Sequence, residues 1–389
     1  MRTHFALRYL SRSHQVTVYA IEPRVAGGAD FPPEEPPGLT TKFFRISSAG
    51  YARNALKGLF SDLPFQVKLY ESADLLRDLS ADVACGRIDL LFVHLLRMAE
   101  YVRPFSHIPR IIDLVDSICL HYQRMPRIWY SPGWLAARAD RERVCRHEAQ
   151  LSASFNAVLL ASPVDLAALR RRTGAENLIL IPNGVEVSAL PSPLKAPELN
   201  RIIFFGTLDY LPNVDAAVYF AREILPLIRK KVPKVRLHVA GWNPPRAVRL
   251  LARIEGVIVQ ANVPDLRAEV SKSVLSVAPL RFGAGTQFKI LESLALGVPV
   301  VATPEPARAL GGDAAGGILI GRNPEEFSHQ VVRLLSDESY RERMGKAGHS
   351  FVESRYSWER VFAPLDGVLK AIECGAHAKS AANHDQRPA

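Results

Sequence analysis

The stretch APLRFGAGTQFKILESLALGVPVV, residues 278–301, decides the fold class of this chain. It joins the end of an apolar strand to a glycine-bearing loop, an amphipathic helix and a second apolar strand. Such an order is typical of an α/β domain, in which a loop leads from a parallel strand into a helix N-terminus. We expect the loop over 279–286, the helix over 287–296 and the second strand over 298–302. The unpaired N–H groups at such a helix start predict an anion site.

Polar side chains at this helix start suggest which anion binds. We expect Thr286 to cap the helix, so that the N–H groups of residues 287–289 point out of its end. Lys289 lies in the first turn, where the helix dipole disfavours a cation, and a bound diphosphate would remove that conflict. Arg281 could reach the same anion, and Glu292, one turn further, could bind a ribose diol. A surface Lys–Glu pair beside a flexible loop explains the pattern equally well.

Length and composition indicate a folded protein of two domains. The chain has 389 residues, of which 48% are hydrophobic and 23% charged, so two α/β domains are the natural expectation. The net charge of +10 favours acidic partners such as nucleic acid, anionic lipid or a phosphorylated small molecule. No basic run is interleaved with aromatic residues, so we expect no nucleic-acid partner. Arginine clusters in 138–146 and 170–172 indicate solvated helix faces, or else a membrane-surface patch.

Cysteine usage and hydropathy indicate the compartment. Cys85, Cys119, Cys145 and Cys374 show neither paired nor metal-like spacing, which suits a reducing cytosol and argues against a disulfide framework or a zinc site. The N-terminal residues lack the apolar core of a signal peptide. No apolar stretch approaches the roughly 18 residues of a membrane span. We therefore expect a cytoplasmic protein.

Helices and strands alternate in both halves, which predicts two Rossmann-like, doubly wound domains. We expect an N-terminal acceptor-side domain over 1–190 and a linker over the proline-rich residues 191–199. A C-terminal donor domain would follow over 200–356, and a final helix over 357–373. The small, polar residues 374–389 predict a disordered tail.

The first domain opens unusually. A helix over 4–11 precedes the first strand, 16–21, whereas an α/β domain usually begins with a strand and a glycine-rich turn. We therefore expect a preceding segment that supplies this strand and turn. Their absence from the chain is also the feature that favours a non-catalytic or truncated subunit.

Several motifs together resemble glycosyltransferase family 4, the retaining enzymes of the GT-B fold. Residues 279–292 match a form of the family's donor-site signature, Pro-Leu-Arg-x-Gly-x-Gly-Thr-x-x-Lys-x-x-Glu. Further matches lie at 181–185, 204–208, 239–241 and 263–266. In the family's commonest form a first Glu contacts the donor sugar. That position falls on Ala284 in this sequence, so the resemblance leaves the sugar open.

The resemblance implies two domains facing a cleft, with the C-terminal helix returning towards the first domain. It implies transfer of a sugar from a nucleotide-sugar donor to a glycan or lipid-linked acceptor with retention, in exopolysaccharide or cell-surface polysaccharide synthesis. The leaving phosphate would take the acceptor proton. Arg281, Lys289 and the helix N-terminus would neutralise the diphosphate, so that neither a metal nor a cofactor is expected. It also allows peripheral attachment to the inner membrane face.

The resemblance further implies particular site residues. The catalytic residues would be Arg281, Lys289 and Glu292. The expected donor-binding residues are Gly206, Gly241, Val263, Gly283, Gly285, Thr286, Gln287 and Phe288. On the acceptor side, the candidates His94, Asp113 and Asp116 follow strand ends, where α/β sites lie, although packing or capping has similar weight. We expect Asn213 and Asp265 to act as helix caps rather than ligands.

Two other functions stay open. One is a sugar-nucleotide epimerase of the same fold, which would release the nucleoside diphosphate without any acceptor. The other is a non-catalytic or truncated GT-B-like subunit that binds a nucleotide sugar or a protein partner.

Overall fold

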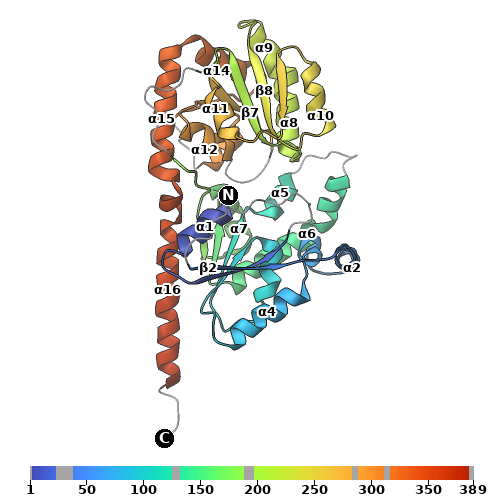
Figure 1. Ribbon diagram of the computed structural model, residues 1–389, viewed down its shortest axis with the longest axis vertical. Helices are drawn as coiled ribbons and strands as arrows, with labels where there is room; N and C mark the ends of the chain where they lie inside the picture. Colours follow the sequence, from blue (N-terminus) through green and yellow to red (C-terminus); the bar gives the residue numbers. More distant parts are fainter. Residues whose placement is uncertain are drawn as a thin grey trace.

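The chain folds into two lobes, with the consecutive helices α15 (Glu338–Tyr356) and α16 (Trp358–His384) in line along one side of them (Figure 1). The computed structural model describes residues 2–22, 38–124, 132–187, 197–282, 288–310 and 316–384. We call residues 2–187 the lower lobe and residues 197–356 the upper lobe. Each lobe is an α/β unit with parallel strands, as the alternating pattern predicts.

The upper lobe is built on a six-stranded parallel sheet of order β12-β11-β10-β7-β8-β9. The strands are β7 (Arg201–Thr207), β8 (Arg236–Trp242), β9 (Val257–Ala261), β10 (Leu275–Ala278), β11 (Val300–Ala302) and β12 (Ile318–Ile320). The helices are α8 (Leu211–Tyr219), η2 (Phe220–Ile224), α9 (Leu225–Arg229), α10 (Arg246–Arg249), η3 (Leu250–Arg253), α11 (Leu266–Ser271), α12 (Phe288–Ala295), α13 (Pro304–Ala309), α14 (Pro324–Ser336) and α15 (Glu338–Tyr356). The central strands are apolar along their length because helices cover both faces of a parallel sheet.

The lower lobe contains a four-stranded and a two-stranded parallel sheet. The first comprises β3 (Leu91–His94), β4 (Arg110–Val115), β5 (Ala157–Leu160) and β6 (Leu178–Leu180), and the second comprises β1 (Val16–Ile21) and β2 (Leu39–Phe44). The helices are α1 (Arg2–Leu10), α2 (Ser48–Leu59), α3 (Phe65–Leu69), α4 (Ala73–Ala84), η1 (Leu96–Val102), α5 (Ile118–Arg124), α6 (Pro132–Ser154) and α7 (Pro163–Thr173). Within the described residues β1 pairs only with β2. The further strand that we expect before α1 stays a prediction.

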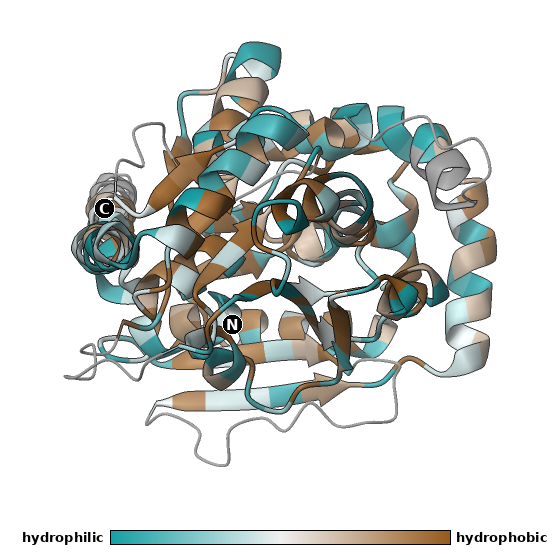
Figure 2. Cartoon of the chain, turned by 90° about the horizontal axis from the view of Figure 1, so that it is seen from above, coloured by the Kyte–Doolittle hydropathy of each residue, from teal (hydrophilic) through white to brown (hydrophobic). Residues whose placement is uncertain are grey.

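Hydrophobic positions gather on the strands and the inner helices, and hydrophilic positions on the outer helices (Figure 2). One apolar cluster joins the lobes, because it contains residues of α1, β5, α12, α15 and α16 (Trp358–His384). Phe5 of α1 stacks on Trp358, with ring centroids 4.7 Å apart. Trp358 also packs so closely on Gly184 that a Cβ there would lie 2.6 Å from the indole ring. The Asn183-Gly184 turn is therefore fixed by α16.

The C-terminal helix is longer than the sequence suggests. We expect it over 357–373, followed by a disordered tail, whereas α16 continues to His384. The residues after Cys374 include four alanines up to Ala382, which favour a helix despite their small, polar neighbours. The last helix therefore ends later than the expected residue 373, whereas the disordered tail stays a prediction.

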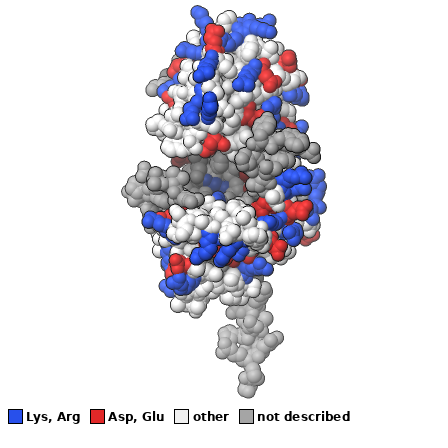
Figure 3. Space-filling model, turned by 90° about the vertical axis from the view of Figure 1, so that its right-hand side faces the viewer, with Lys and Arg blue, Asp and Glu red and all other residues white. Residues whose placement is uncertain are grey.

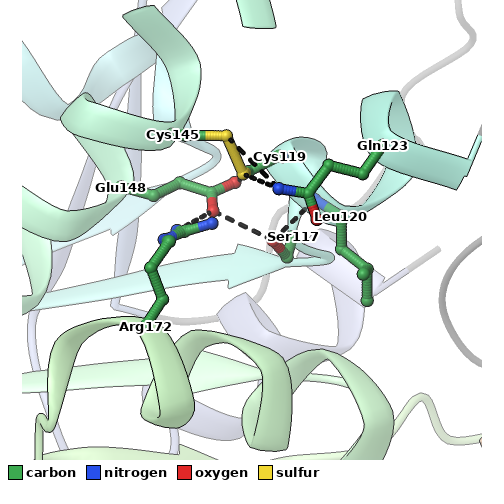
Figure 4. The surroundings of a disulfide bond; sticks show 7 residues. All are labelled: Ser117, Cys119, Leu120, Gln123, Cys145, Glu148 and Arg172. Carbon is green, nitrogen blue, oxygen red and sulfur yellow. Dashed lines mark hydrogen bonds and ion pairs between the residues drawn. A yellow bond between two sulfur atoms is a disulfide. The ribbon is translucent and has the colours of Figure 1, made fainter. Parts of the chain in front are cut away.

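Cys119 of α5 and Cys145 of α6 form a disulfide, with their Cα atoms 4.9 Å apart (Figure 4). The expectation that the cysteines are unpaired is therefore wrong, and the inference of a reducing cytosol from their spacing loses its basis. The two residues are 26 positions apart, and only the packing of α5 on α6 brings them together. Beside them, the Glu148 carboxylate accepts hydrogen bonds from Ser117 and Arg172. Cys85 and Cys374 are free and exposed.

Among the described helices, none is both long and apolar enough to span a membrane.

Candidate functional site

Lys289 is a buried cation in the first turn of α12. Its side chain lies over the Phe204 ring, with Nζ 4.6 Å from the ring centroid, and only 6% of the residue is exposed. Nζ donates a hydrogen bond to Asn213 Oδ1, and Lys289 forms no ion pair with any residue that the structure describes. Burial lowers the pKa of Lys289 to about 7. An anion bound here would compensate a charge that is otherwise buried without a counterion.

Glycines at two strand ends bring backbone close to Lys289. Gly206 is the penultimate residue of β7 and has φ +144°, and a Cβ at this position would lie 3.7 Å from Lys289 Cε. Gly241 is the penultimate residue of β8 and has φ +155°, and a Cβ there would collide with the Gly206 carbonyl. Both conformations favour glycine. The structure thus places Gly206 beside the lysine, and Gly241 packs directly against Gly206.

Asn213 is not the cap that we expect. Tyr210 occupies the N-cap of α8, and Asn213 lies inside the helix. Its amide Nδ2 donates to Thr207 O at 2.8 Å, while its Oδ1 accepts from Lys289. The side chain therefore connects the end of β7 to the buried lysine, so it belongs to the site.

Glu292 has an oxygen without a hydrogen-bond partner. The residue is 8% exposed, and its Oε2 accepts from Arg267 Nη1 at 2.8 Å. Its Oε1 is buried and has no partner among the residues that the structure describes. Burial raises the pKa of Glu292, and Arg267 opposes that shift. Because buried polar atoms are nearly always paired, this oxygen is suited to a ligand hydroxyl.

The alternative of a surface Lys–Glu pair is wrong. Lys289 and Glu292 are both buried, and each binds a different partner. Arg267, which pairs with Glu292, is not among the site residues predicted from the sequence. It follows the 263–266 motif by one position, but nothing in its spacing from Glu292 indicates the contact.

Arg281 already has a carboxylate partner, unlike Lys289. Its guanidinium pairs with Asp215 of α8, with Nε 2.9 Å from Oδ2, and lies over the Tyr219 ring. The hydrogen bonds with Asp215 raise the pKa of Arg281. Its side chain is 48% exposed. In this arrangement Arg281 would have to break its ion pair with Asp215 before it could bind an anion at α12.

The structure describes only some of the remaining residues that we expect on the donor side. Gly283, Gly285, Thr286 and Gln287 lie outside the described residues, so these positions stay predictions. Phe288 begins α12, is partly buried and packs against Trp358. Val263 packs on the cluster around Phe205. Asp265 caps α11 as expected, because its Oδ1 accepts from Ala268 N at 2.9 Å.

Two acceptor-side candidates are joined to a structural ion pair. Asp113 is fully buried and accepts from Arg2 Nε at 2.7 Å and Arg2 Nη2 at 3.0 Å. His94 Nδ1 lies 3.4 Å from the same carboxylate. Burial alone would raise the pKa of Asp113, but His94 and Arg2 lower it. Asp113 therefore ties α1 to β4 and presents no open carboxylate to a substrate.

Asp116 is the acceptor-side candidate whose carboxylate is not used within the lobe. Its Oδ1 is buried without a hydrogen-bond partner in the described part of the chain. Burial and the nearby Asp165 raise the pKa of Asp116 to about 7. Asp116 in turn contributes to raising the pKa of Tyr210 in the upper lobe to about 12, mainly an effect of burial. The carboxylate thus lies where the lobes meet.

Aromatic side chains line the same junction. His121 of α5 stacks on Tyr210, with ring centroids 6.2 Å apart. Neither His121 nor Tyr210 can be assigned to the site from sequence alone, because only the fold brings α5 to the upper lobe.

Comparison with known proteins agrees with this arrangement. Residues 200–337 match the family described as Glycosyl transferases group 1. The D-inositol 3-phosphate glycosyltransferase of Thermobifida fusca is 27% identical over 224 residues, which cover 50% of this chain and 49% of that enzyme. The chain spans about half or less of the length of the curated relatives that it matches.

Solved structures agree in fold. The sucrose-phosphate synthase of Thermosynechococcus elongatus has a TM-score of 0.70 at 15% identity, covering 96% of this chain and 92% of that one. HepE of Anabaena, in complex with UDP and glucose, has a TM-score of 0.61 at 12% identity, covering 86% of each chain. The fold is therefore the α/β, two-lobed GT-B architecture, and the comparisons together support a glycosyltransferase.

Proposed function

We propose that the protein is a retaining glycosyltransferase that binds a nucleotide sugar between Lys289 and Glu292. The acceptor would be a glycan or a lipid-linked sugar in cell-surface or exopolysaccharide synthesis. One observation carries the proposal: a buried lysine lies one helical turn from a buried carboxylate oxygen, and among the described residues the lysine has no counterion and the oxygen has no hydrogen-bond donor. A nucleoside diphosphate supplies both missing groups, because its diphosphate is anionic and its ribose carries a diol.

The chemistry follows from the charge of Lys289. As the bond between sugar and phosphate breaks, negative charge develops on the leaving diphosphate, and a preorganised cation stabilises it. The N-terminus of α12 adds its dipole at the same place. Because Gly206 has no side chain and lies beside Lys289, its backbone would be open to the phosphates. We propose that this set replaces a metal ion, so that chelating agents leave nucleotide binding unchanged.

The acceptor would enter from the lower lobe, on the side of Asp116. Its unpaired Oδ1 can accept a hydrogen bond from an acceptor hydroxyl. The leaving phosphate would take the acceptor proton on the same face of the sugar, which gives retention. HepE, whose solved complex contains UDP and glucose, supports a nucleotide-sugar donor.

A binding experiment tests the donor site. Isothermal titration of UDP-, GDP- and ADP-sugars against the wild type should identify one nucleotide class. Lys289→Met should weaken that binding by roughly tenfold to a hundredfold, since a hydrogen bond to a charged group contributes about 1.5–3 kcal/mol. Glu292→Gln should also weaken it. Lys234→Met, at an exposed lysine, is the matched control. Unchanged affinity in both site variants would refute the proposal.

Product analysis separates transfer from its rivals. Release of nucleoside diphosphate only when a glycan acceptor is present supports a transferase. Release without any acceptor would instead indicate an epimerase or hydrolase, and binding without turnover would indicate a non-catalytic subunit.

A further inference from the structure

The outward face of α2 carries large apolar side chains. Leu56 is 61% exposed, Leu59 is 60% exposed and Phe60, directly after the helix, is 87% exposed. In the part of the chain that the structure describes, no other three large exposed apolar residues fall within five positions of sequence. We call Leu56, Leu59 and Phe60 the α2 patch. Contiguous exposed apolar surface marks an interaction site more often than scattered residues do.

These side chains do not serve the packing of α2. The helix contacts the lobe through its opposite face, where Tyr51, Asn54 and Gly58 are buried. Gly58 is pressed against α3, because a Cβ there would lie 3.0 Å from the Phe65 ring. Polar residues at the patch would leave this packing intact.

The patch is held in a fixed position. Arg143 of α6 donates to Gly58 O at 2.9 Å and to Leu59 O at 3.4 Å, so it caps the end of α2. Asp140 of α6 accepts from Phe65 N at 2.9 Å. These contacts fix the end of α2 on α6, so that Leu59 and Phe60 project from an ordered helix end rather than from a frayed one.

Cations accompany the patch. Arg53 and Lys57 are exposed on α2, and neither forms an ion pair with a residue that the structure describes. Arg141 and Arg146 are exposed on α6, which contacts the end of α2 through Arg143, and the acids Asp62 and Glu142 are exposed as well. The side of the molecule on which α2 lies in Figure 1 faces the viewer in Figure 3, where Lys and Arg border uncharged surface on the lower lobe.

We propose that the α2 patch seats the lower lobe on the surface of an anionic lipid bilayer. Apolar side chains would enter the headgroup boundary, and Arg53 and Lys57 would meet lipid phosphates from their flexible stems. A second copy of the chain fits less well, because self-association through this face would bring the same unpaired cations together. The net charge of +10 adds long-range attraction to an anionic membrane. The proposal does not depend on the transfer reaction.

Flotation of the full chain with phospholipid vesicles tests the proposal. Vesicles of phosphatidylcholine with phosphatidylglycerol should carry the protein, and vesicles of phosphatidylcholine alone should carry much less. The triple variant Leu56→Ser, Leu59→Ser, Phe60→Ser should bind at least about tenfold more weakly, because interfacial affinity scales with buried apolar area. Arg53→Gln with Lys57→Gln should lose most of the preference for phosphatidylglycerol. The control Leu199→Ser, at a site 72% exposed, should bind like the wild type.

Two further measurements keep the result unambiguous. Phe60→Trp should show fluorescence quenching by brominated lipid, in excess of the wild type, if residue 60 enters the bilayer. The triple serine variant should melt at the wild-type temperature and keep its nucleotide-sugar affinity, which separates this proposal from the proposed function. Equal binding of wild type and triple variant to anionic vesicles would overturn the proposal. A second result would also overturn the proposal. In it, sedimentation shows that wild-type chains self-associate, the triple variant does not self-associate, and the wild type does not bind vesicles.

Discussion

Lys289 makes nucleotide binding sensitive to pH. Its pKa is lowered to about 7 in the folded chain by burial, so the side chain is largely neutral above that pH. A bound diphosphate favours the charged form, and binding above pH 7 must therefore take up a proton. Below pH 7 the lysine is already charged and this requirement disappears.

We predict that the affinity for a nucleotide sugar falls as pH rises above about 7, by up to tenfold per pH unit. A nucleotide sugar is preferred for this test because its diphosphate diester does not ionise in this range. Titration calorimetry in buffers of different ionisation enthalpy measures the proton uptake. The Lys289→Met variant should bind the nucleotide sugar more weakly, and its affinity should no longer depend on pH in this range. A wild-type affinity that is constant from pH 6 to pH 9 would contradict the assignment.

The ion pair of Arg2 with Asp113 is structural rather than catalytic. Both side chains are almost fully buried, and Arg2 also donates to Pro182 O and Asn183 Oδ1. Arg2→Met should therefore destabilise the chain by about 3–5 kcal/mol, because it leaves a buried carboxylate without its partner. Urea unfolding measures the loss. The double variant Arg2→Met, Asp113→Asn should recover part of it, and full retention of stability in the single variant would be inconsistent with this role.

At the residue scale the sequence predicts residue types better than contacts. Lys289 and Glu292 stand out from their spacing at a helix start, and the structure finds both buried at one site. Asn213 is predicted as a cap because asparagine commonly caps helices. Its actual partner, Lys289, lies 76 positions away, and no local pattern reveals such a contact. The Arg267–Glu292 and Arg281–Asp215 pairs escape prediction for the same reason.

At the element scale, amphipathic periodicity predicts α12 well. The expected helix over 287–296 is observed as Phe288–Ala295, because its apolar residues recur at helical spacing and a glycine follows it. The disulfide between α5 and α6 is different. It depends on how two helices pack, which the spacing of Cys119 and Cys145 does not encode.

This disulfide should stabilise the lower lobe measurably. It closes a loop of 26 residues, for which a chain-entropy estimate gives about 3 kcal/mol. Addition of dithiothreitol should therefore lower the melting temperature of the wild type. Cys119→Ala with Cys145→Ala should melt at the reduced value and show no response to the reductant. Identical melting of oxidised and reduced wild type would contradict a stabilising role.

At the scale of the whole molecule, the parallel sheets follow from the alternation of strands and helices. The contact between lobes does not, because it depends on residues at opposite ends of the chain. Trp358 is its centre, since it contacts Phe5, Phe288 and Phe362.

Trp358→Ala should therefore weaken both lobes together. We expect a loss of about 3–5 kcal/mol, the usual cost of removing a large buried aromatic side chain. Differential scanning calorimetry is the appropriate measurement, because two separated transitions would show that the lobes had become independent. Trp242→Ala, at an exposed tryptophan, should leave the melting profile unchanged. A wild-type profile in Trp358→Ala would show that α16 does not couple the lobes.

The packing of α1 on α16 also constrains biosynthesis. Arg12, just after α1, pairs with Glu359 at the start of α16, 347 residues later. A ribosome therefore releases α1 long before it has translated the helix that covers it. Domains commonly fold in order as they emerge, but in this lower lobe the face of α1 that α16 covers stays exposed until translation of the upper lobe is complete. We expect that face to be open to a chaperone during that interval.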